Sequence, residues 1–174
     1  MSRSSLFLAL ALILCLLAGC PGGDVPPPDN SRDPIAGVDP SVAAAPGEVR
    51  AGRIEPGEES AVFGGIGAEG KAGDFKIYND RVQFIVQGPY YSHGYVETGG
   101  MVMDADLVRG PRTLHRDPFD DFFLSHGIGW LFHASKVEVI EDGASGTATV
   151  RSTGHFEPWK FIHGAIEADE PILP

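Results

Sequence analysis

In several short runs between residues 75 and 151, apolar side chains recur at every second position, and this spacing restricts those runs to extended strands. Residues 75–77 and 82–86 alternate in this way, and Asn79-Asp80 between them is typical of a tight hairpin turn. A period of two places alternate side chains on opposite faces of a strand, whereas a helix needs a period of about 3.6. No stretch keeps helical spacing over three turns with a cap, so the pattern predicts strands and not a helical domain.

A second pair of alternating runs, residues 136–140 and 147–151, flanks the acidic, glycine-rich segment 141–146. Another short apolar run, residues 101–103, follows the pair Gly99-Gly100. The sequence holds 23 glycines, and turn signals recur about every ten residues, which is typical of short strands joined by tight turns. We therefore predict an all-β fold, either an antiparallel β-sandwich or a supersandwich-like sheet.

The amino-terminal residues have the composition of an export signal. Residues 1–5 are polar and carry one basic side chain, Arg3, and residues 6–18 are apolar without a break. This run is shorter than the roughly 20 residues that a helix needs to cross the hydrocarbon core of a membrane. A basic start followed by a short apolar run predicts a signal peptide over residues 1–19. A short buried helix is disfavoured, because Pro21-Gly22-Gly23 ends the run and a proline-rich stretch follows.

The four residues Leu17-Ala18-Gly19-Cys20 stand at the end of the apolar run. They resemble the lipobox of bacterial lipoproteins, and the resemblance implies cleavage before Cys20, diacylglycerol on its thiol and an acyl chain on its new amino group. Two or three chains hold a protein firmly on a membrane, because each buried methylene contributes about 0.8 kcal/mol. We predict lipidation of Cys20, with the membrane as partner; the alternative is an ordinary secretory signal that is cut beside a cysteine.

Residues 20–52 are rich in Pro, Gly, Ala and Asp and show no hydrophobic period. This composition favours an extended, disordered and partly polyproline chain, so we predict a tether that holds the following domain away from the membrane. The β-rich domain is expected over residues 53–174. Because Cys15 leaves with the signal and Cys20 carries lipid, the domain has no disulfide and depends on its core for stability.

The charge of the chain limits its partners. It carries 24 acidic against 13 basic side chains, a formal charge of −11. This balance argues against nucleic acid and anionic lipid head groups as partners. It is typical of a solvated surface, or of one that attracts cations. With the export signal, it predicts a location outside the cytoplasm on a bacterial membrane, and we favour the outer membrane or the cell surface.

Longer stretches carry a second resemblance. Segments 73–87, 99–106, 137–143 and 158–162 resemble the N-terminal region of large, uncharacterised exported bacterial lipoproteins. The first strands are also similar to those of galactose-mutarotase-like supersandwiches, where a Gly-Gly-strand-Asp element follows a two-stranded start. Those folds hold more strands than this chain does, and its last residues contain no closing element. We therefore expect the domain to be incomplete at its C-terminus, as the first part of a larger product.

Carboxylates and histidines gather between residues 104 and 126. The first two aspartates alternate at the end of a strand and so face one side of it. Carboxylates on flexible loops suit Ca²⁺, and an added histidine moves the preference toward a transition metal such as Zn²⁺. The predicted metal ligands are Asp104, Asp106, His115, Asp117, Asp120, Asp121 and His126. Alternatively, the aspartates are turn and cap residues around nearby phenylalanines, because their spacing matches no fixed metal motif.

A glycine-bounded loop concentrates hydroxylated aromatic side chains that suit the recognition of a sugar or a peptide. Flat tyrosine faces stack on sugar rings, and their hydroxyls form hydrogen bonds at the rim. The predicted ligand-binding residues are Tyr90, Tyr91, His93 and Tyr95. The alternative is that one or two of these tyrosines close the top of the sheet.

Two further patterns carry less functional information. The segment from Gly65 to Gly70 has the glycine spacing of a dinucleotide-binding loop, but it leads into a strand where such a loop opens a helix, so we predict a glycine-rich turn. Four histidines lie beside aromatic residues, which favours packed or rim side chains over general bases. They are His126, His133, His155 and His163. No serine stands in a Gly-x-Ser-x-Gly frame, so no catalytic residues are predicted.

Together these patterns predict a lipid-anchored protein of the cell envelope that acts as a binding or scaffolding module, with an envelope glycan or protein as partner. The alternative is the N-terminal part of a carbohydrate-active or metal-dependent extracytoplasmic enzyme, to which residues 104–126 contribute ligands.

Overall fold

The computed structural model describes residues 31–92, 96–110, 117, 119, 121–127 and 129–160. The expected signal peptide and Cys20 lie outside these residues, as do four of the predicted site residues, His93, Tyr95, His115 and Asp120. The chain divides into two units, Met1–Arg32 and Asp33–Pro174, and the second contains nearly all described residues. No helix among the described residues is long and apolar enough to cross a membrane.

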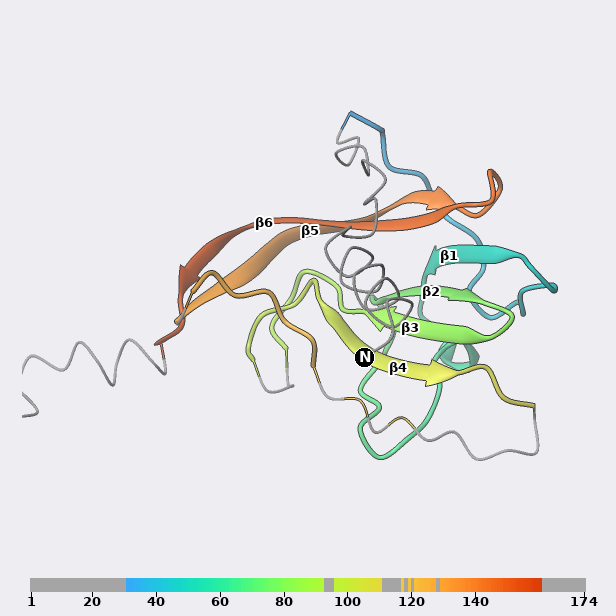
Figure 1. The fold of residues 1–174 in the computed structure, drawn as a ribbon, viewed down its shortest axis with the longest axis horizontal. Helices are drawn as coiled ribbons and strands as arrows, with labels where there is room; N and C mark the ends of the chain where they lie inside the picture. The colour runs from blue at the N-terminus through green and yellow to red at the C-terminus, as the bar shows by residue number, and fades with distance from the viewer. Residues whose placement is uncertain are drawn as a thin grey trace, which may run out of the picture. The chain divides into compact units, whose positions relative to one another are not determined.

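The described chain forms two antiparallel sheets, which confirms the predicted all-β, sandwich-like fold (Figure 1). The first sheet has four strands in the order β1-β2-β3-β4, and the second is the hairpin β5-β6. The strands are β1 (Val49–Arg53), β2 (Phe75–Asn79), β3 (Val82–Val86), β4 (Val102–Leu107), β5 (Trp130–Asp142) and β6 (Ala148–Pro158). One short 3₁₀ helix, η1 (Glu59–Ala61), lies between β1 and β2.

The two hairpins form where the alternating apolar runs predicted them. Between β2 and β3, the side chain of Asn79 accepts hydrogen bonds from the N–H groups of Arg81 at 2.7 Å and Val82 at 2.8 Å. This local bond fixes the turn, which is the usual role of asparagine in that position. Between β5 and β6, Gly143 and Gly146 have positive φ values of 108° and 87°, which glycine adopts readily.

The inner face of the four-stranded sheet packs against the hairpin β5-β6. Buried apolar side chains from β1, β2, β3 and β5 form this core: Ala51, Phe75, Val86, Val137 and Val139. The outer face has a core of its own under the segment between β1 and β2, made by Ile54, Ala61, Phe63, Ile85 and Met103. The neighbours Ile85 and Val86 belong to different cores, which is the expected result of strand alternation.

The β unit begins earlier than the predicted boundary at residue 53. Residues 33–52 lie within it, although they were expected to belong to the tether. The N–H of Ile35 donates to the carbonyl of Val139 at 2.9 Å, and the hydroxyl of Tyr78 donates to the carbonyl of Val42 at 2.6 Å. Because backbone groups make these contacts, the segment needs no hydrophobic period to join the unit.

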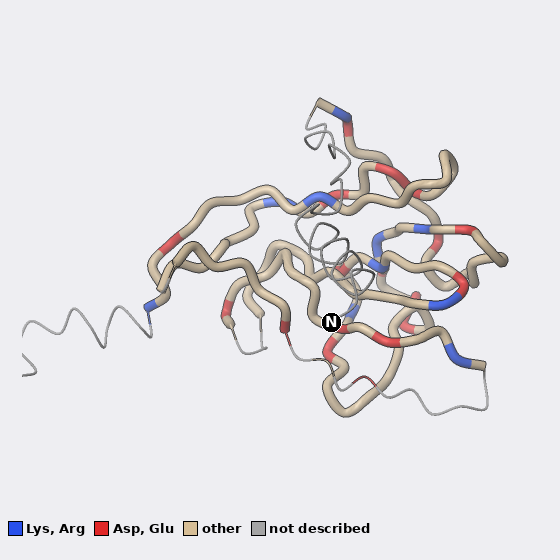
Figure 2. The backbone as a smooth tube through the Cα atoms, in the orientation of Figure 1, with Lys and Arg blue, Asp and Glu red and all other residues tan. Residues whose placement is uncertain are grey.

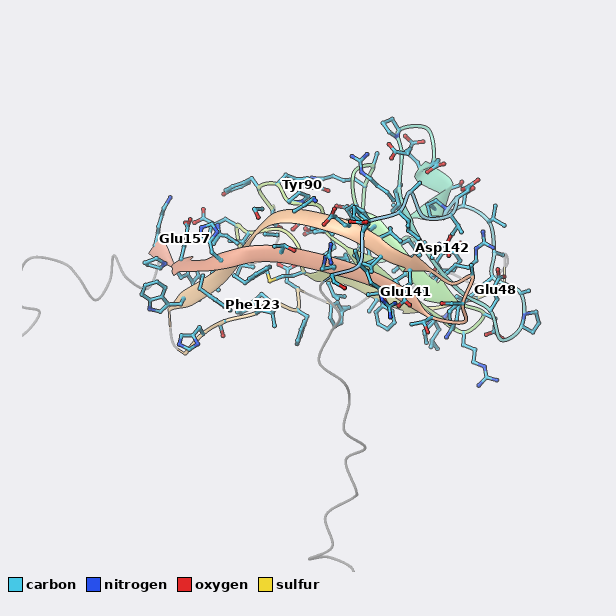
Figure 3. All side chains as sticks on the ribbon, turned by 90° about the horizontal axis from the view of Figure 1, so that it is seen from above. Glu48, Tyr90, Phe123, Glu141, Asp142 and Glu157 are labelled. Carbon is cyan, nitrogen blue, oxygen red and sulfur yellow. The ribbon has the colours of Figure 1, made fainter. Side chains whose placement is uncertain are left out.

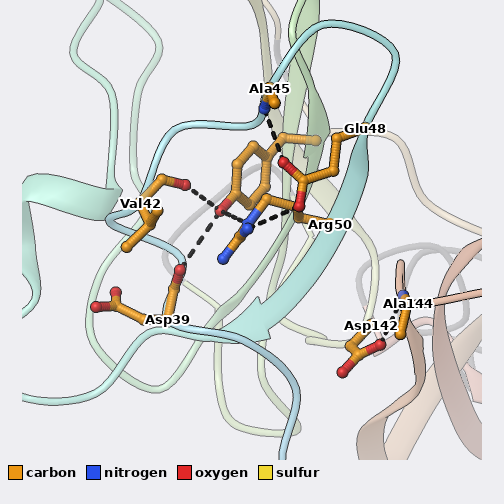
Figure 4. A network of polar contacts seen from close by, with 8 residues as sticks. Asp39, Val42, Ala45, Glu48, Arg50, Asp142 and Ala144 are labelled. Carbon is orange, nitrogen blue, oxygen red and sulfur yellow. Dashed lines mark hydrogen bonds and ion pairs between the residues drawn. The ribbon is translucent and has the colours of Figure 1, made fainter. Parts of the chain in front are cut away.

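A polar network holds the same segment in place (Figure 4). The guanidinium of Arg50 on β1 contacts Glu48 at 2.9 Å and donates to the Tyr78 hydroxyl at 3.0 Å. The carboxylate of Glu48 also accepts the N–H of Ala45 at 2.7 Å, and this bond is the main cause that lowers the pKa of Glu48. The chain before β1 is thus connected both to β1 and to its neighbour β2.

Candidate functional site

A groove of about 770 Å³ lies beside β5, and its volume is within the range of about 300–1,000 Å³ that is usual for ligand pockets. Val137 and Val139 of β5 line it, and so do Pro89 and Tyr90, which follow β3. Phe75 contributes apolar surface, and Arg53 and Glu55 contribute charge. We call this feature the β5 groove.

The segment before β1 forms a rim of the β5 groove because of a sharp change of direction. Ile35 pairs with Val139, and two residues later Gly37 pairs with Gly52 of β1. Gly37 has a φ of 78°, and a Cβ at this position would lie 2.9 Å from the carbonyl oxygen of Ala51. Only glycine fits such a crossing without strain. The crossing leaves the segment from Pro34 to Ala36 along the groove.

The ring of Tyr90 is fixed in the groove by internal contacts. Its hydroxyl donates to the carboxylate of Asp74, which also accepts the N–H of Gly88 at 2.9 Å and the N–H of Lys71 at 2.8 Å. Burial, followed by the bond to Asp74, raises the pKa of Tyr90 well above its ordinary value. The ammonium of Lys71 lies 4.6 Å from the centre of the ring. Tyr90 therefore acts as a rigid, uncharged wall.

The predicted tyrosine loop contributes to the β5 groove in part. Tyr90 lines the groove, and the neighbouring Tyr91 is 65% exposed. His93 and Tyr95 lie outside the described residues. Because the hydroxyl and ring of Tyr90 already have partners, stacking on a sugar stays a prediction that depends on Tyr91.

Charged side chains of both signs lie along the groove. Arg53 contacts Glu55 at 2.9 Å, with both side chains about half exposed. The carboxylate of Glu138 contacts Lys136 at 2.6 Å and Arg151 at 3.3 Å. The hydrogen bond from Lys136 is the main cause that lowers the pKa of Glu138. Along the described chain, basic and acidic residues are interspersed (Figure 2). The groove therefore offers an apolar centre with charges of both signs beside it.

The edge of β5 that faces away from β6 has a free stretch. Near one end, Leu131 pairs with Ser125 and the N–H of Phe132 donates to Leu124, and near the other end Val139 pairs with Ile35. Between these contacts, no described strand or bridge pairs with residues 133–138 on that side. Backbone groups alternate in direction along a strand, so those of Val137 point the same way as those of Val139, away from β6.

Among the predicted metal ligands that the structure describes, no three come together. Asp104 is fully buried, and its two oxygens accept the N–H groups of Glu69 at 2.9 Å and Gly70 at 2.7 Å. Burial raises the pKa of Asp104 to about 6 and the charge of Asp117 helps to raise it, although these two bonds oppose the shift. Asp106 contacts the guanidinium of Arg109 instead. Asp104 thus anchors a loop.

Three other predicted ligands among the described residues each have contacts of their own. His126 contacts the ring of Phe156, with ring centres 5.8 Å apart, and Asp121 lines a separate cavity of about 10 Å³ with Gln87 and Thr98. Asp117 is fully buried and accepts the N–H of Phe119 through its carboxylate at 2.8 Å. In the described part of the chain, no group of three or more His, Cys, Asp or Glu side chains is preformed for a metal ion.

The three glycines of the dinucleotide-like pattern have a packing role. A Cβ at Gly65 would lie 2.3 Å from the nitrogen of Asp117, and a Cβ at Gly67 would lie 2.7 Å from the carbonyl of Phe119. A Cβ at Gly70 would lie 2.7 Å from the carboxylate of Asp104. The predicted glycine-rich turn is therefore a tightly fitted loop, in which each glycine allows another part of the chain to approach.

Sequence reasoning missed most of the β5 groove. Ile35 lies in the segment expected to be a tether, and Val137 reads as an ordinary core residue of a hairpin. No local pattern connects them, because the groove arises from the crossing at Gly37. Comparisons with protein-family models, with curated proteins and with solved structures found no match for this chain.

Proposed function

We propose that this protein is a lipid-anchored binding module of the bacterial cell envelope, held to a membrane through Cys20. Its ligand is an extended segment of another envelope protein, which binds in the β5 groove. The observation that carries this proposal is the free edge of β5 at residues 133–138, beside an apolar groove of about 770 Å³.

The chemistry of the groove suits an extended peptide. A strand that adds to a sheet edge gains main-chain hydrogen bonds, and neighbouring pockets receive alternate side chains. The backbone of Val137 supplies such an edge, and Ile35 and Phe75 supply apolar surface. The ion pairs of Arg53 and Glu138 lie beside it and offer charged partners to polar side chains of the ligand.

The groove is tested by photo-crosslinking in living cells. A photo-reactive residue at position 55, in the groove, is expected to capture one protein, with the adduct mapping by mass spectrometry to a single extended segment. The same residue at position 81, on the exposed β2-β3 turn, gives no such adduct. Ala36→Arg places a long side chain in the groove and abolishes capture from position 55. An adduct with glycan, or equal capture from both positions, overturns the proposed ligand.

The anchor is tested separately by metabolic labelling with a fatty acid. The natural chain is expected to take up the label and to fractionate with membranes, because two or more acyl chains bind a bilayer firmly. Cys20→Ala is expected to lose both properties. Continued labelling of the Cys20→Ala chain contradicts the anchor and leaves the groove experiment unaffected.

A further inference from the structure

Three side chains with metal-binding donors share one place on the hairpin β5-β6. His133 on β5 lies directly opposite His155 on β6, and Glu157 follows two residues after His155, so its side chain is on the same face. The two imidazole rings have centres 6.2 Å apart and an interplanar angle of 30°. Glu157 lies toward the far end of the hairpin from Asp142 (Figure 3).

The nitrogen and oxygen atoms of these side chains already face one another. Nε2 of His155 lies 2.6 Å from one carboxylate oxygen of Glu157, and Nε2 of His133 lies 3.9 Å from the other. A tetrahedral ion with bonds of about 2.0–2.1 Å holds its donor atoms about 3.3–3.4 Å apart. The two observed separations lie on either side of that value. The side chains would therefore have to rotate for the three donors to surround one ion.

The side chains are free enough to make this movement. Their exposed fractions are 33% for His133, 62% for His155 and 46% for Glu157. As they lie, His155 and Glu157 bond to each other, and the group is not a preformed metal centre. An ion would take the place of this exposed contact, which contributes little to stability.

We propose that His133, His155 and Glu157 bind a divalent transition-metal ion of the Zn²⁺ class. Two imidazoles and one carboxylate are a donor set that favours transition metals over Ca²⁺ or Mg²⁺, which prefer oxygen ligands. Water completes the coordination, because three protein ligands leave a position open. The site is separate from the β5 groove, so it does not depend on the proposed function.

Bulges in the hairpin bring the two histidines opposite each other. The register shifts once between Ala134 and Lys136 and once between Val139 and Glu141. If the register that pairs Asp142 with Ala148 ran unshifted to the far end of the hairpin, His133 would lie opposite Glu157 and not opposite His155. Bulges re-aim side chains in this way, and they are frequent beside binding sites.

The test is a metal titration of the full chain, purified in a mild detergent without a polyhistidine tag. Zn²⁺ is titrated against a coloured chelator, and Co²⁺ binding is followed by its visible absorption. We expect one ion per chain at this site and a Co²⁺ spectrum typical of nitrogen and oxygen ligands. His133→Ala and His155→Ala should each weaken binding by more than about tenfold, since even the outer partners of metal ligands contribute that much.

The matched control is His126→Ala, because His126 is exposed and lies outside this group. It should leave the affinity unchanged, and Glu157→Gln should weaken it while both imidazoles remain. Thermal melts of each variant verify that the fold is retained. Binding that survives both His133→Ala and His155→Ala, or that falls equally in His126→Ala, overturns the proposal, as does the absence of Zn²⁺ binding by the folded natural chain.

Discussion

The inner face of the four-stranded sheet is apolar, whereas the outer face, beneath residues 55–72, buries polar and charged side chains beside apolar ones. Phe75 and Val86 on the inner face pack against β5. On the outer face, Lys76, Gln83 and Asp104 are buried with Ile85. The inner layer is held by apolar packing, which does not depend on pH. The outer layer is held in part by hydrogen bonds from loop N–H groups to a carboxylate, so its stability depends on a proton equilibrium.

The largest expected effect comes from the inner face. Phe75→Ala should lower the free energy of unfolding by about 3–5 kcal/mol, because it leaves a cavity under β5. Since no ionisable group belongs to this core, the loss should be the same at pH 4.5 and pH 7. Denaturant unfolding of the full chain at both pH values measures it. A loss below about 1 kcal/mol would mean that the two sheets are not packed through this residue.

The outer face should respond to pH through Asp104. Its pKa is about 6 in the folded chain, above the ordinary value of 3.8, so between these values the folded state holds more protons than the unfolded state. The contribution of this group therefore rises as pH falls from 7 toward 4. Relative to Asp104→Asn, the natural chain should gain about 2 kcal/mol between pH 7 and pH 4.5. If the difference in free energy of unfolding between the natural chain and Asp104→Asn stayed the same from pH 7 to pH 4.5, the raised pKa of Asp104 would be contradicted.

A smaller effect is expected where the loop meets Asp104. Gly70→Ala places a Cβ 2.7 Å from the Asp104 carboxylate and 3.2 Å from Ile85, so the loop must move. We expect a loss of about 1–3 kcal/mol, which is usual for overpacking. Gly64→Ala is the matched control in the same loop, because nothing lies within 4 Å of its added Cβ. Equal melting temperatures for the two variants would show that the loop yields without cost.

The smallest effect is expected at the edge of the outer layer. Tyr90→Phe removes the hydroxyl that donates to Asp74, while the N–H groups of Lys71 and Gly88 continue to donate to the same carboxylate. The loss should be about 1 kcal/mol, the usual net contribution of one hydrogen bond. Because the ring remains, peptide binding in the β5 groove should persist. Loss of crosslinking in this variant would mean that the hydroxyl, and not the ring, positions the ligand.

Local patterns were sufficient to predict the two hairpins of this protein, but not β1, most of which lies in the predicted tether. The alternating runs located both hairpins, and Asn79-Asp80 marked the β2-β3 turn. The composition of residues 33–52 predicted a tether, whereas the segment belongs to the β unit. Isolated backbone bonds and one polar network hold it there, and neither produces a hydrophobic period in the sequence. The sequence predicts Asp104 as a metal ligand, but its two oxygens accept hydrogen bonds from loop N–H groups. A sequence pattern cannot show which backbone groups will reach a carboxylate.

The opposition of His133 and His155 was also beyond the reach of local patterns. The predicted strands ended at residues 136 and 151, whereas β5 and β6 continue to Trp130 and Pro158. Extending the hairpin on paper would place both histidines on one face, but the bulges that set their register depend on tertiary packing.

The bulge beside Ser135 also has a consequence for how this gene tolerates insertions and deletions. It separates the half of β5 that packs in the core, with Val137 and Val139, from the half that carries His133. Loss of the Ser135 codon would remove the extra residue and make Ala134 and Lys136 neighbours opposite Gly154 and Thr153, so both halves of β5 would keep their register and their faces. Over evolutionary time, a single-residue deletion at this point can thus straighten the hairpin without turning either half of it to another face.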